Sequence, residues 1–241
     1  MRIKTAASHA EFARAAADWT VAHLRERPRS VLALPTGNTP LGLYAELAER
    51  SRAGDASLAE ARIFNLDEYL GLPSSDPHSY AAFLHRHVID PLNLAVENVR
   101  LLKGDAADSP AECRAYDAAL ADCGGIDVCI LGLGASGHIA FNEPGATWDL
   151  RTHITQLSDT TRAAHARQAA KPWNIPTQGL TMGIRTILDA EHILLLIAGA
   201  NKQAARGALQ RGVPDPEWPV TSLLSHASLT TIELCDAAVC P

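Results

Sequence analysis

Residues 31–40 read VLALPTGNTP, a short apolar run that ends directly at a segment of turn-forming residues. The residues that follow, LGLYAELAER (41–50), have the apolar spacing of a helix. The succession recurs later, where IDVCILGLG (126–134) and HILLLIAG (192–199) read as buried strands and NKQAARGALQ (201–210) as a helix. Apolar strands without strict alternation, separated by helices, are typical of a parallel sheet covered on both faces. The sequence therefore predicts an α/β fold with a mostly parallel sheet and helices on both faces.

The remaining segments fit this alternation of strands and helices. ARIFNLDEY (61–69) reads as a strand that runs into a loop, and SYAAFLHRHVI (79–89) reads as a helix. No linker, charge block or fixed-period repeat interrupts the succession, so residues 1–241 are expected to form a single domain. Residues 145–180 read less regularly than the rest, and we expect a mobile flap there.

Composition limits the partners that the chain can bind. It has 241 residues, of which 47% are hydrophobic, and its formal net charge is -6. This charge argues against a broad positively charged surface that would bind nucleic acid or an anionic membrane, although local hydrogen-bond donors can still hold a small anion. The longest apolar stretch, residues 193–198, is far too short for a membrane helix, and the first residues lack the apolar region of a signal peptide. We therefore expect a cytoplasmic protein whose partner is a small molecule.

Neither disulfides nor a metal site are signalled. The five cysteines form an odd set without CxxC spacing, so we expect reduced thiols. His78, His85 and His87 crowd one region with Asp76, but they do not match HExxH. The spacing of His85 and His87 also puts them on different sides of a helix. No metal ion is predicted.

The turn after the first apolar run has the composition of an anion site. Gly37 permits backbone conformations closed to other residues, Thr39 can cap the following helix, and Pro40 suits its first turn. Free N–H groups then converge where the helix dipole favours negative charge, and a phosphate fits there. An ordinary strand-to-helix turn would use the same residues, so the motif alone leaves both interpretations open. It is neither a Walker loop nor GxGxxG, and no nucleotide is implied.

FNLDEY (64–69) places two adjacent carboxylates at the end of a strand. Successive side chains of a strand point to opposite faces, so at most one of Asp67 and Glu68 faces the cleft beyond the strand ends. The other can support the loop or bind a backbone donor. Asp67, which follows the apolar Leu66, is the better candidate for a general base. Acidic pairs are also common as solvated surface groups, which is the competing interpretation.

GLGASGHIAFNEP (132–144) puts a histidine beside the same cleft. Its glycines let the chain turn sharply at a strand end and let a ligand approach the backbone closely. His138 comes within range of Glu143 if the segment folds back. A carboxylate that holds one ring nitrogen fixes the tautomer and raises the basicity of the other nitrogen, as ring-opening acid–base chemistry requires.

Taken together, PTGNTPLGLY (35–44), FNLDEYLGL (64–72) and GLGASGHIAFNEP (132–144) resemble the signatures of the glucosamine-6-phosphate deaminase (isomerase) family. The resemblance continues in the same order through residues 180–202 and 220–226, so it covers nearly the whole chain. It implies a modified Rossmann-like, doubly wound fold. It also implies conversion of glucosamine 6-phosphate to fructose 6-phosphate and ammonia by a single catalytic domain without an organic cofactor.

The resemblance also implies roles for individual residues. Asp67 matches the base that moves a proton between carbons 2 and 1, and His138 with Glu143 matches the ring-opening pair. Backbone donors, hydroxyl donors and two positive charges would hold the substrate phosphate. They belong to Thr36, Gly37, Asn38, Thr39, Arg167 and Lys202.

One candidate catalytic residue departs from the family's pattern. The family normally has an acid two residues before the histidine, whereas this chain has Ser136. Serine can hydrogen-bond but supplies no negative charge, so we expect the imidazolium form of His138 to be less stabilised than in the usual triad. Either Glu143 suffices, or another hexosamine 6-phosphate is preferred, or turnover is low.

Three other functions stay open on the sequence alone. A galactosamine-6-phosphate deaminase would differ in the loop side chains that recognise the stereochemistry at carbon 4 of the sugar. A 6-phosphogluconolactonase would have no need of a carbon-2 base such as Asp67. A sugar-phosphate-sensing module of a transcription regulator would need a DNA-binding head, for which the roughly 30 residues before the first strand have neither the length nor the basic charge.

The sequence leaves the oligomeric state open between a monomer and a homo-oligomer. Some members of the family are allosteric hexamers that bind an effector phosphate through basic residues shortly after the FNEP segment. His153 and Thr155 stand at positions that those members fill with Arg and Lys. We therefore expect hyperbolic kinetics.

Overall fold

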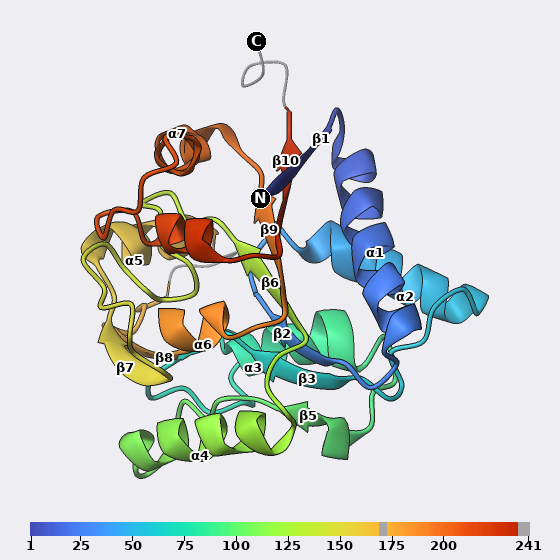
Figure 1. The fold of residues 1–241 in the computed structure, drawn as a ribbon. Coiled ribbons are helices and arrows are strands. Elements are labelled where there is room, and N and C mark those ends of the chain that lie inside the picture. Colours follow the sequence, from blue (N-terminus) through green and yellow to red (C-terminus); the bar gives the residue numbers. More distant parts are fainter. Residues whose placement is uncertain (169–172, 236–241) are drawn as a thin grey trace.

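The protein is built around a parallel sheet, seen in a computed structural model that describes residues 1–168 and 173–235 (Figure 1). The strands of this sheet are β1 (Arg2–Ala6), β2 (Val31–Leu34), β3 (Arg62–Asn65), β5 (Val99–Arg100), β6 (Val128–Gly132), β9 (His192–Ile197) and β10 (Leu229–Leu234). They lie in the order β1-β10-β9-β6-β2-β3-β5, and every neighbouring pair is parallel. The prediction of a mostly parallel sheet is confirmed.

Helices cover both faces of this sheet, as the sequence predicted (Figure 1). One face carries α1 (His9–Glu26), α2 (Leu41–Ala53), α3 (Tyr80–Leu84) and the π-helical turn His85–Ile89. The other face carries α4 (Ser109–Asp122), α6 (Ile184–Leu188), α7 (Gln203–Gln210) and the 3-10 helix Pro219–Ser225. Two further 3-10 turns are Val96–Asn98 and Ala200–Lys202. The helix expected over residues 79–89 is therefore α3 continued by a π-helical turn.

Burial on both faces explains why the strand sequences lack polar alternation. On β9, Ile193 and Leu195 pack in one apolar cluster with α4, α6 and α7, whereas Leu194 and Leu196 pack in a second cluster with α1 and α2. All four side chains are fully buried. Burying one such side chain stabilises the fold by about 1.5–3 kcal/mol, so both layers hold the sheet in place.

A second, antiparallel sheet lies beside the first. It consists of β4 (Asp67–Tyr69), β8 (Gln178–Thr181) and β7 (His153–Gln156), in that order. Asp67 is opposite Thr181 in the register, and Ile154 is opposite Leu180. Between β7 and β8 the chain forms α5 (Asp159–Gln168). Residues 169–172, within the range where a mobile flap was expected, lie outside the described residues.

A single residue, Leu66, connects the two sheets. Its N–H donates to the carbonyl of Leu34 in the parallel sheet, and its own carbonyl accepts the N–H of Met182 beside the antiparallel sheet. The fully buried Asn65 fixes this corner, because its side chain donates to the carbonyl of Asp67 and accepts the N–H of Leu102. The segment that was expected to run from a strand into a loop instead enters a second strand.

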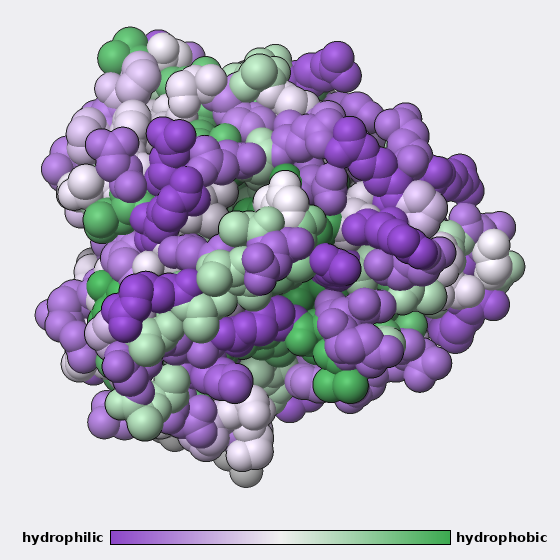
Figure 2. Space-filling model, turned by 60° about the horizontal axis from the view of Figure 1, so that its bottom comes forward, coloured by the Kyte–Doolittle hydropathy of each residue, from purple (hydrophilic) through white to green (hydrophobic). Residues whose placement is uncertain are grey.

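The molecular surface is more polar than these buried layers. Figure 2, which turns the bottom of Figure 1 forward, shows a face that is mostly hydrophilic, with hydrophobic residues in smaller areas between. Among the described residues, no helix combines the length and apolar character that a membrane span requires.

The cysteines differ in part from expectation. Cys113, Cys123 and Cys129 are free, but Cys235 is disulfide-bonded, so the expectation of five reduced thiols was wrong for this residue. Cys235 directly follows β10 and is half-buried, whereas Cys113 and Cys129 are buried in the core. Cys240 lies outside the described residues.

Candidate functional site

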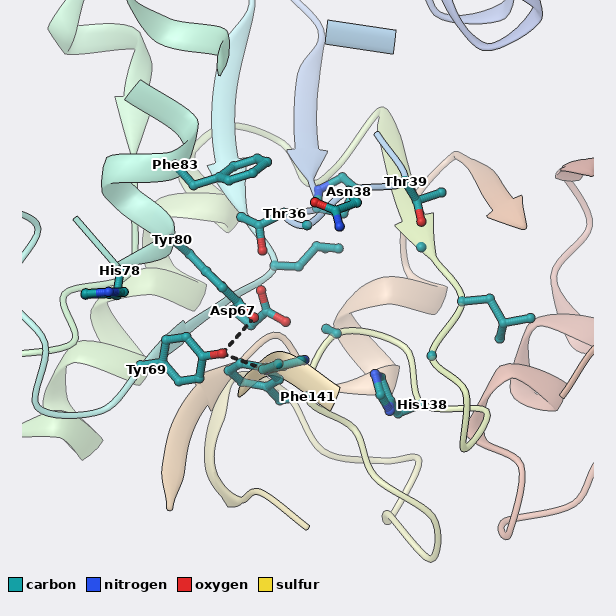
Figure 3. A pocket seen from close by; sticks show the side chains of 18 of the residues that line it. Thr36, Asn38, Thr39, Asp67, Tyr69, His78, Tyr80, Phe83, His138 and Phe141 are labelled. Carbon is teal, nitrogen blue, oxygen red and sulfur yellow. Dashed lines mark hydrogen bonds between the residues drawn. The ribbon is translucent and has the colours of Figure 1, made fainter. Parts of the chain in front are cut away.

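A cavity of about 830 Å³ opens at the carboxyl ends of the parallel strands (Figure 3). β2 and β6 are neighbours in the sheet. After β2 the chain continues to β3 on one side, and after β6 it continues to β9 on the other side, so the two connections lead in opposite directions. Such a switch point leaves a crevice outside the strand ends. The cavity wall includes the segments that follow β2, β3, β6 and β9, together with residues of α3, the π-helical turn and α5, and it includes residues of all three sequence motifs. Its volume suits a small molecule.

The turn after β2 presents unpaired N–H groups at this cavity. The backbone N–H groups of Gly37, Asn38 and Thr39 make no hydrogen bond within the part of the chain that the structure describes. Gly37 has a φ of 90°, which favours glycine. The expectation that Thr39 caps α2 was wrong: Pro40 holds the N-cap position without a side-chain bond, and the carbonyl of Asn38 accepts the N–H of Leu41. The free N–H groups at the start of α2 form a site suited to an anion.

Asp67 and Glu68 on β4 point in opposite directions. Asp67 lines the cavity and is 6% exposed, and burial together with the charge of Glu68 raises the pKa of its carboxyl well above the usual range. Glu68 instead accepts the backbone N–H groups of Tyr69, Tyr80 and Ala81 where α3 begins, and burial raises its pKa to about 7. Asp67 is thus the carboxyl that a ligand meets, and Glu68 supports the wall behind it.

His138 is directed into the same cavity as Asp67 (Figure 3). The nearest partner of its Nδ1 is the hydroxyl of Ser136, at 2.9 Å. The turn before it depends on glycine, because a Cβ on Gly134 would lie 2.3 Å from the imidazole ring. Burial and the nearby charge of Lys202 lower the pKa of His138 to about 4, so the imidazole is neutral at pH 7.

Glu143 lies behind His138 and outside hydrogen-bond distance of it. Its Oε2 is 3.9 Å from Nδ1 of His138, and its Oε1 accepts both the N–H and the hydroxyl of Ser158 at 3.2 Å. Oε2 is buried and has no hydrogen-bond partner among the described residues. A buried acceptor without a partner is costly, so this oxygen is placed to stabilise a proton on the imidazole.

Comparison with known proteins identifies the family of the chain. Residues 4–232 match the sequence model of the family described as glucosamine-6-phosphate isomerases and 6-phosphogluconolactonase. The chain belongs to this family. A family member from Lysinibacillus sphaericus, named glucosamine-6-phosphate deaminase, is 40% identical over 222 residues, which cover 92% of this chain and 94% of the relative. One of the same name from a Geobacillus strain is 38% identical over 237 residues, covering 98% and 94%.

Solved structures of the family share the fold. A structure described as a monomeric glucosamine-6-phosphate deaminase matches with a TM-score of 0.95 and 36% identity over 99% of each chain. The 6-phosphogluconolactonase from Leishmania guyanensis matches with a TM-score of 0.79 and 22% identity, over 97% of this chain and 95% of that one. The second likeness concerns the fold alone.

Of the two positive charges that the family resemblance implied, only Lys202 lies in the cavity wall. It ends the 3-10 turn after β9, and burial lowers the pKa of its ammonium group below the usual value. Arg167 lies on an exposed side of α5 and is not among the wall residues. Arg86, from the π-helical turn, lies in the wall although nothing in the sequence singled it out.

Three further ring-bearing residues of the wall, Tyr69, Tyr80 and His165, were not predicted from the sequence. The hydroxyl of Tyr69 lies 2.6 Å from Nδ1 of His165, and the hydroxyl of Tyr80 donates to that of Tyr69 at 3.3 Å (Figure 3). Strand alternation could have identified Tyr69, because it lies two residues after Asp67 and so shares its face. No local pattern identifies His165, whose partner is 96 residues away in the sequence.

Proposed function

We propose that this chain isomerises and deaminates glucosamine 6-phosphate, giving fructose 6-phosphate and ammonia. The position of Asp67 carries the proposal: it is a buried carboxyl in a cavity that also holds the unpaired N–H groups of residues 37–39 and His138. An isomerising deaminase needs a base at carbon 2. A lactonase does not, because ester hydrolysis moves no carbon-bound proton. The names of the relatives support the same substrate.

The first step of the proposed reaction is ring opening at His138. The neutral imidazole accepts the proton of the carbon-1 hydroxyl and returns a proton to the ring oxygen, so that the bond between carbon 1 and the ring oxygen breaks and an aldehyde forms. Ser136 contacts Nδ1, and the unpaired Oε2 of Glu143 stabilises the imidazolium while it exists. Both are positioning residues for His138.

Asp67 performs the second step. It takes the proton from carbon 2, which the aldehyde has made more acidic, and returns it to carbon 1. As the carbon-2 proton leaves, the carbonyl oxygen on carbon 1 takes a proton from the neighbouring ammonium group, so that an enolamine forms; the return of the proton from Asp67 to carbon 1 then leaves an imine at carbon 2. Water adds to this imine, ammonia leaves, and fructose 6-phosphate remains. The raised pKa of Asp67 suits this step, because a carboxylate that holds a proton more firmly is a stronger base toward carbon.

The phosphate is proposed to bind at the turn after β2. The N–H groups of Gly37, Asn38 and Thr39 would donate to its oxygens, the Thr36 hydroxyl would add a donor, and Lys202 would supply positive charge. Arg167, which is not among the wall residues, is given no part in this proposed phosphate site.

Ammonia release tests the function. Purified chain would be incubated with glucosamine 6-phosphate, galactosamine 6-phosphate and 6-phosphogluconolactone in parallel. We expect the highest kcat/KM with glucosamine 6-phosphate, and fructose 6-phosphate in the same amount as ammonia. Hydrolysis of the lactone without ammonia from either amino sugar would overturn the proposal, and a preference for galactosamine 6-phosphate would change the substrate but keep the reaction.

A further inference from the structure

One face of α5 and the residue before it contact three residues in the cavity wall or directly behind it. Ser158, directly before the helix, donates to Glu143, and Thr161 lies with its hydroxyl 3.5 Å from Nδ1 of His138. His165 contacts Tyr69. Residues spaced by three and four positions share one face of a helix, so these three side chains form a single polar stripe. The first two reach groups with a role in the proposed reaction, whereas His165 has none assigned.

The hydroxyl groups next to His165 determine where its proton lies. The hydroxyl of Tyr80 donates to that of Tyr69, so the single proton of Tyr69 is left for Nδ1 of His165, at 2.6 Å. Burial lowers the pKa of His165 to about 4, which makes the ring neutral at pH 7. A neutral imidazole that accepts at Nδ1 carries its hydrogen on Nε2. His165 therefore offers an N–H donor of fixed position.

This donor has no hydrogen-bond partner among the residues that the structure describes. His165 lines the cavity, and its Nε2 makes no hydrogen bond to any part of the chain that the structure describes. A donor that loses water when a ligand fills the cavity is costly unless the ligand accepts its hydrogen bond. The partner of Nε2 must then be an acceptor on the ligand.

We propose that His165 is a further substrate-binding residue, whose Nε2–H donates to a sugar oxygen on a carbon adjacent to carbon 2. The proposal rests on the proposed function. Asp67 and Tyr69 share one face of β4, about 7 Å apart along the strand. Figure 3 shows Tyr69 on the opposite side of Asp67 from Asn38 and Thr39, so His165 serves the sugar end of the ligand and not its phosphate. The substrate's ammonium group has only donors, which leaves the oxygen on carbon 1 or carbon 3.

Tyr69 and Tyr80 are then positioning residues that act through His165. Without the Tyr69 hydroxyl, Nδ1 loses its donor, and the imidazole can exchange between its two neutral tautomers. Only one of the two tautomers presents a hydrogen at Nε2. Tyr69→Phe should therefore weaken substrate binding by less than loss of the imidazole itself.

Kinetics of two His165 variants test the proposal. His165→Phe keeps a ring but removes the donor, and we expect kcat/KM for glucosamine 6-phosphate to fall about tenfold or more, mainly through KM. Competitive inhibition by inorganic phosphate should change less than about twofold, because that probe lacks the sugar oxygens. Ala166→Phe, which adds a ring on the exposed side of α5, is the matched control. Unchanged kcat/KM in His165→Phe, or an equal loss of phosphate inhibition, would overturn the proposal.

The tautomer of His165 gives a readout that does not depend on activity. Long-range ¹H–¹⁵N spectra of histidine-labelled protein, with His165 assigned by its absence in His165→Phe, should show hydrogen on Nε2 in the wild type and a mixture in Tyr69→Phe. Hydrogen on Nδ1 in the wild type would contradict the proposal. If the wild type released no ammonia, the proposed function alone would fail. Titration with fructose 6-phosphate would then decide the inference, since equal affinity of wild type and His165→Phe would overturn it.

Discussion

At the scale of single residues, the neutrality of His138 governs the proposed chemistry. Its Nδ1 contacts the uncharged hydroxyl of Ser136 at 2.9 Å, while the carboxylate of Glu143 lies 3.9 Å away. Burial and the charge of Lys202 keep its pKa at about 4. A neutral imidazole accepts a proton at pH 7, but a base of such low pKa holds that proton weakly. A negative charge in place of the Ser136 hydroxyl should therefore make His138 a stronger base.

Ser136→Asp should raise kcat for glucosamine 6-phosphate, because a carboxylate at Nδ1 makes the ring more basic. It should also raise the pKa of His138 by about one unit or more. Since only the neutral ring accepts the proton, the acid limb of the kcat/KM profile moves to higher pH. Ser136→Asn, which adds the size without the charge, should leave that limb in place. Lower activity of Ser136→Asp on every hexosamine phosphate would mean that the site is built around serine.

Lys202→Ala should act through the phosphate. Removing a charged donor to an anion costs about 1.5–3 kcal/mol, so we expect KM for glucosamine 6-phosphate to rise at least tenfold. Residual activity on unphosphorylated glucosamine should change little, because that substrate has no phosphate to bind. Equal losses on both substrates would assign Lys202 another role. Arg167→Ala is the informative companion, since Arg167 lies outside the cavity wall.

The sequence placed some of these residues and not others, for a physical reason. Asp67, His138 and Lys202 each lie a few residues after the end of a strand of the parallel sheet. The carboxyl ends of parallel strands lie at one edge of the sheet, so these residues were expected to lie close together. Arg167 and His165 lie on α5 instead. Which side of a helix faces a cavity depends on how the helix packs, and residues 159–168 carry little apolar pattern to indicate it.

At the scale of elements, long apolar runs were predictable and the small sheet was not. β2, β6 and β9 lie where the apolar runs predicted strands, because both faces of each are buried. β4 has three residues, and β7 reads HITQ without clear alternation. These short segments are strands because each pairs with β8, a contact distant in sequence that no local pattern encodes.

The turn after β6 offers a test at this scale. In Gly134→Ala the new Cβ would meet the imidazole of His138 at 2.3 Å, so the ring must leave its position. We expect kcat to fall at least tenfold, a barrier increase of about 1.4 kcal/mol, with little change in the thermal midpoint. Gly207→Ala on α7, where a Cβ meets nothing within 4 Å, is the control and should keep full activity. A Gly134→Ala enzyme of wild-type activity would show that the ring position is not critical.

At the scale of the whole molecule, regulation depends on whether β7 can hold an effector phosphate. β7 is an edge strand of the small sheet, and it carries His153 and Thr155 where allosteric members of the family have Arg and Lys. Nδ1 of His153 bonds the carbonyl of Arg151 at 2.8 Å. An effector shifts an equilibrium only by its differential affinity for two states, and neither side chain supplies a permanent charge.

Substrate–velocity curves should therefore be hyperbolic, and N-acetylglucosamine 6-phosphate should not activate. The curves would be measured with and without this effector over a wide substrate range. A Hill coefficient clearly above one that falls toward one on its addition would reveal a regulatory site elsewhere in the molecule.

Ammonia release by Asp67→Asn tests whether Asp67 moves the carbon-2 proton of an amino-sugar phosphate. The amide keeps the shape of the side chain but cannot take the proton. We expect the variant still to bind fructose 6-phosphate but kcat to fall by at least about a thousandfold, or roughly 4 kcal/mol in barrier. A variant that releases ammonia from glucosamine 6-phosphate within about tenfold of the wild-type rate, a difference of only ~1.4 kcal/mol, would show that Asp67 is not the base at carbon 2.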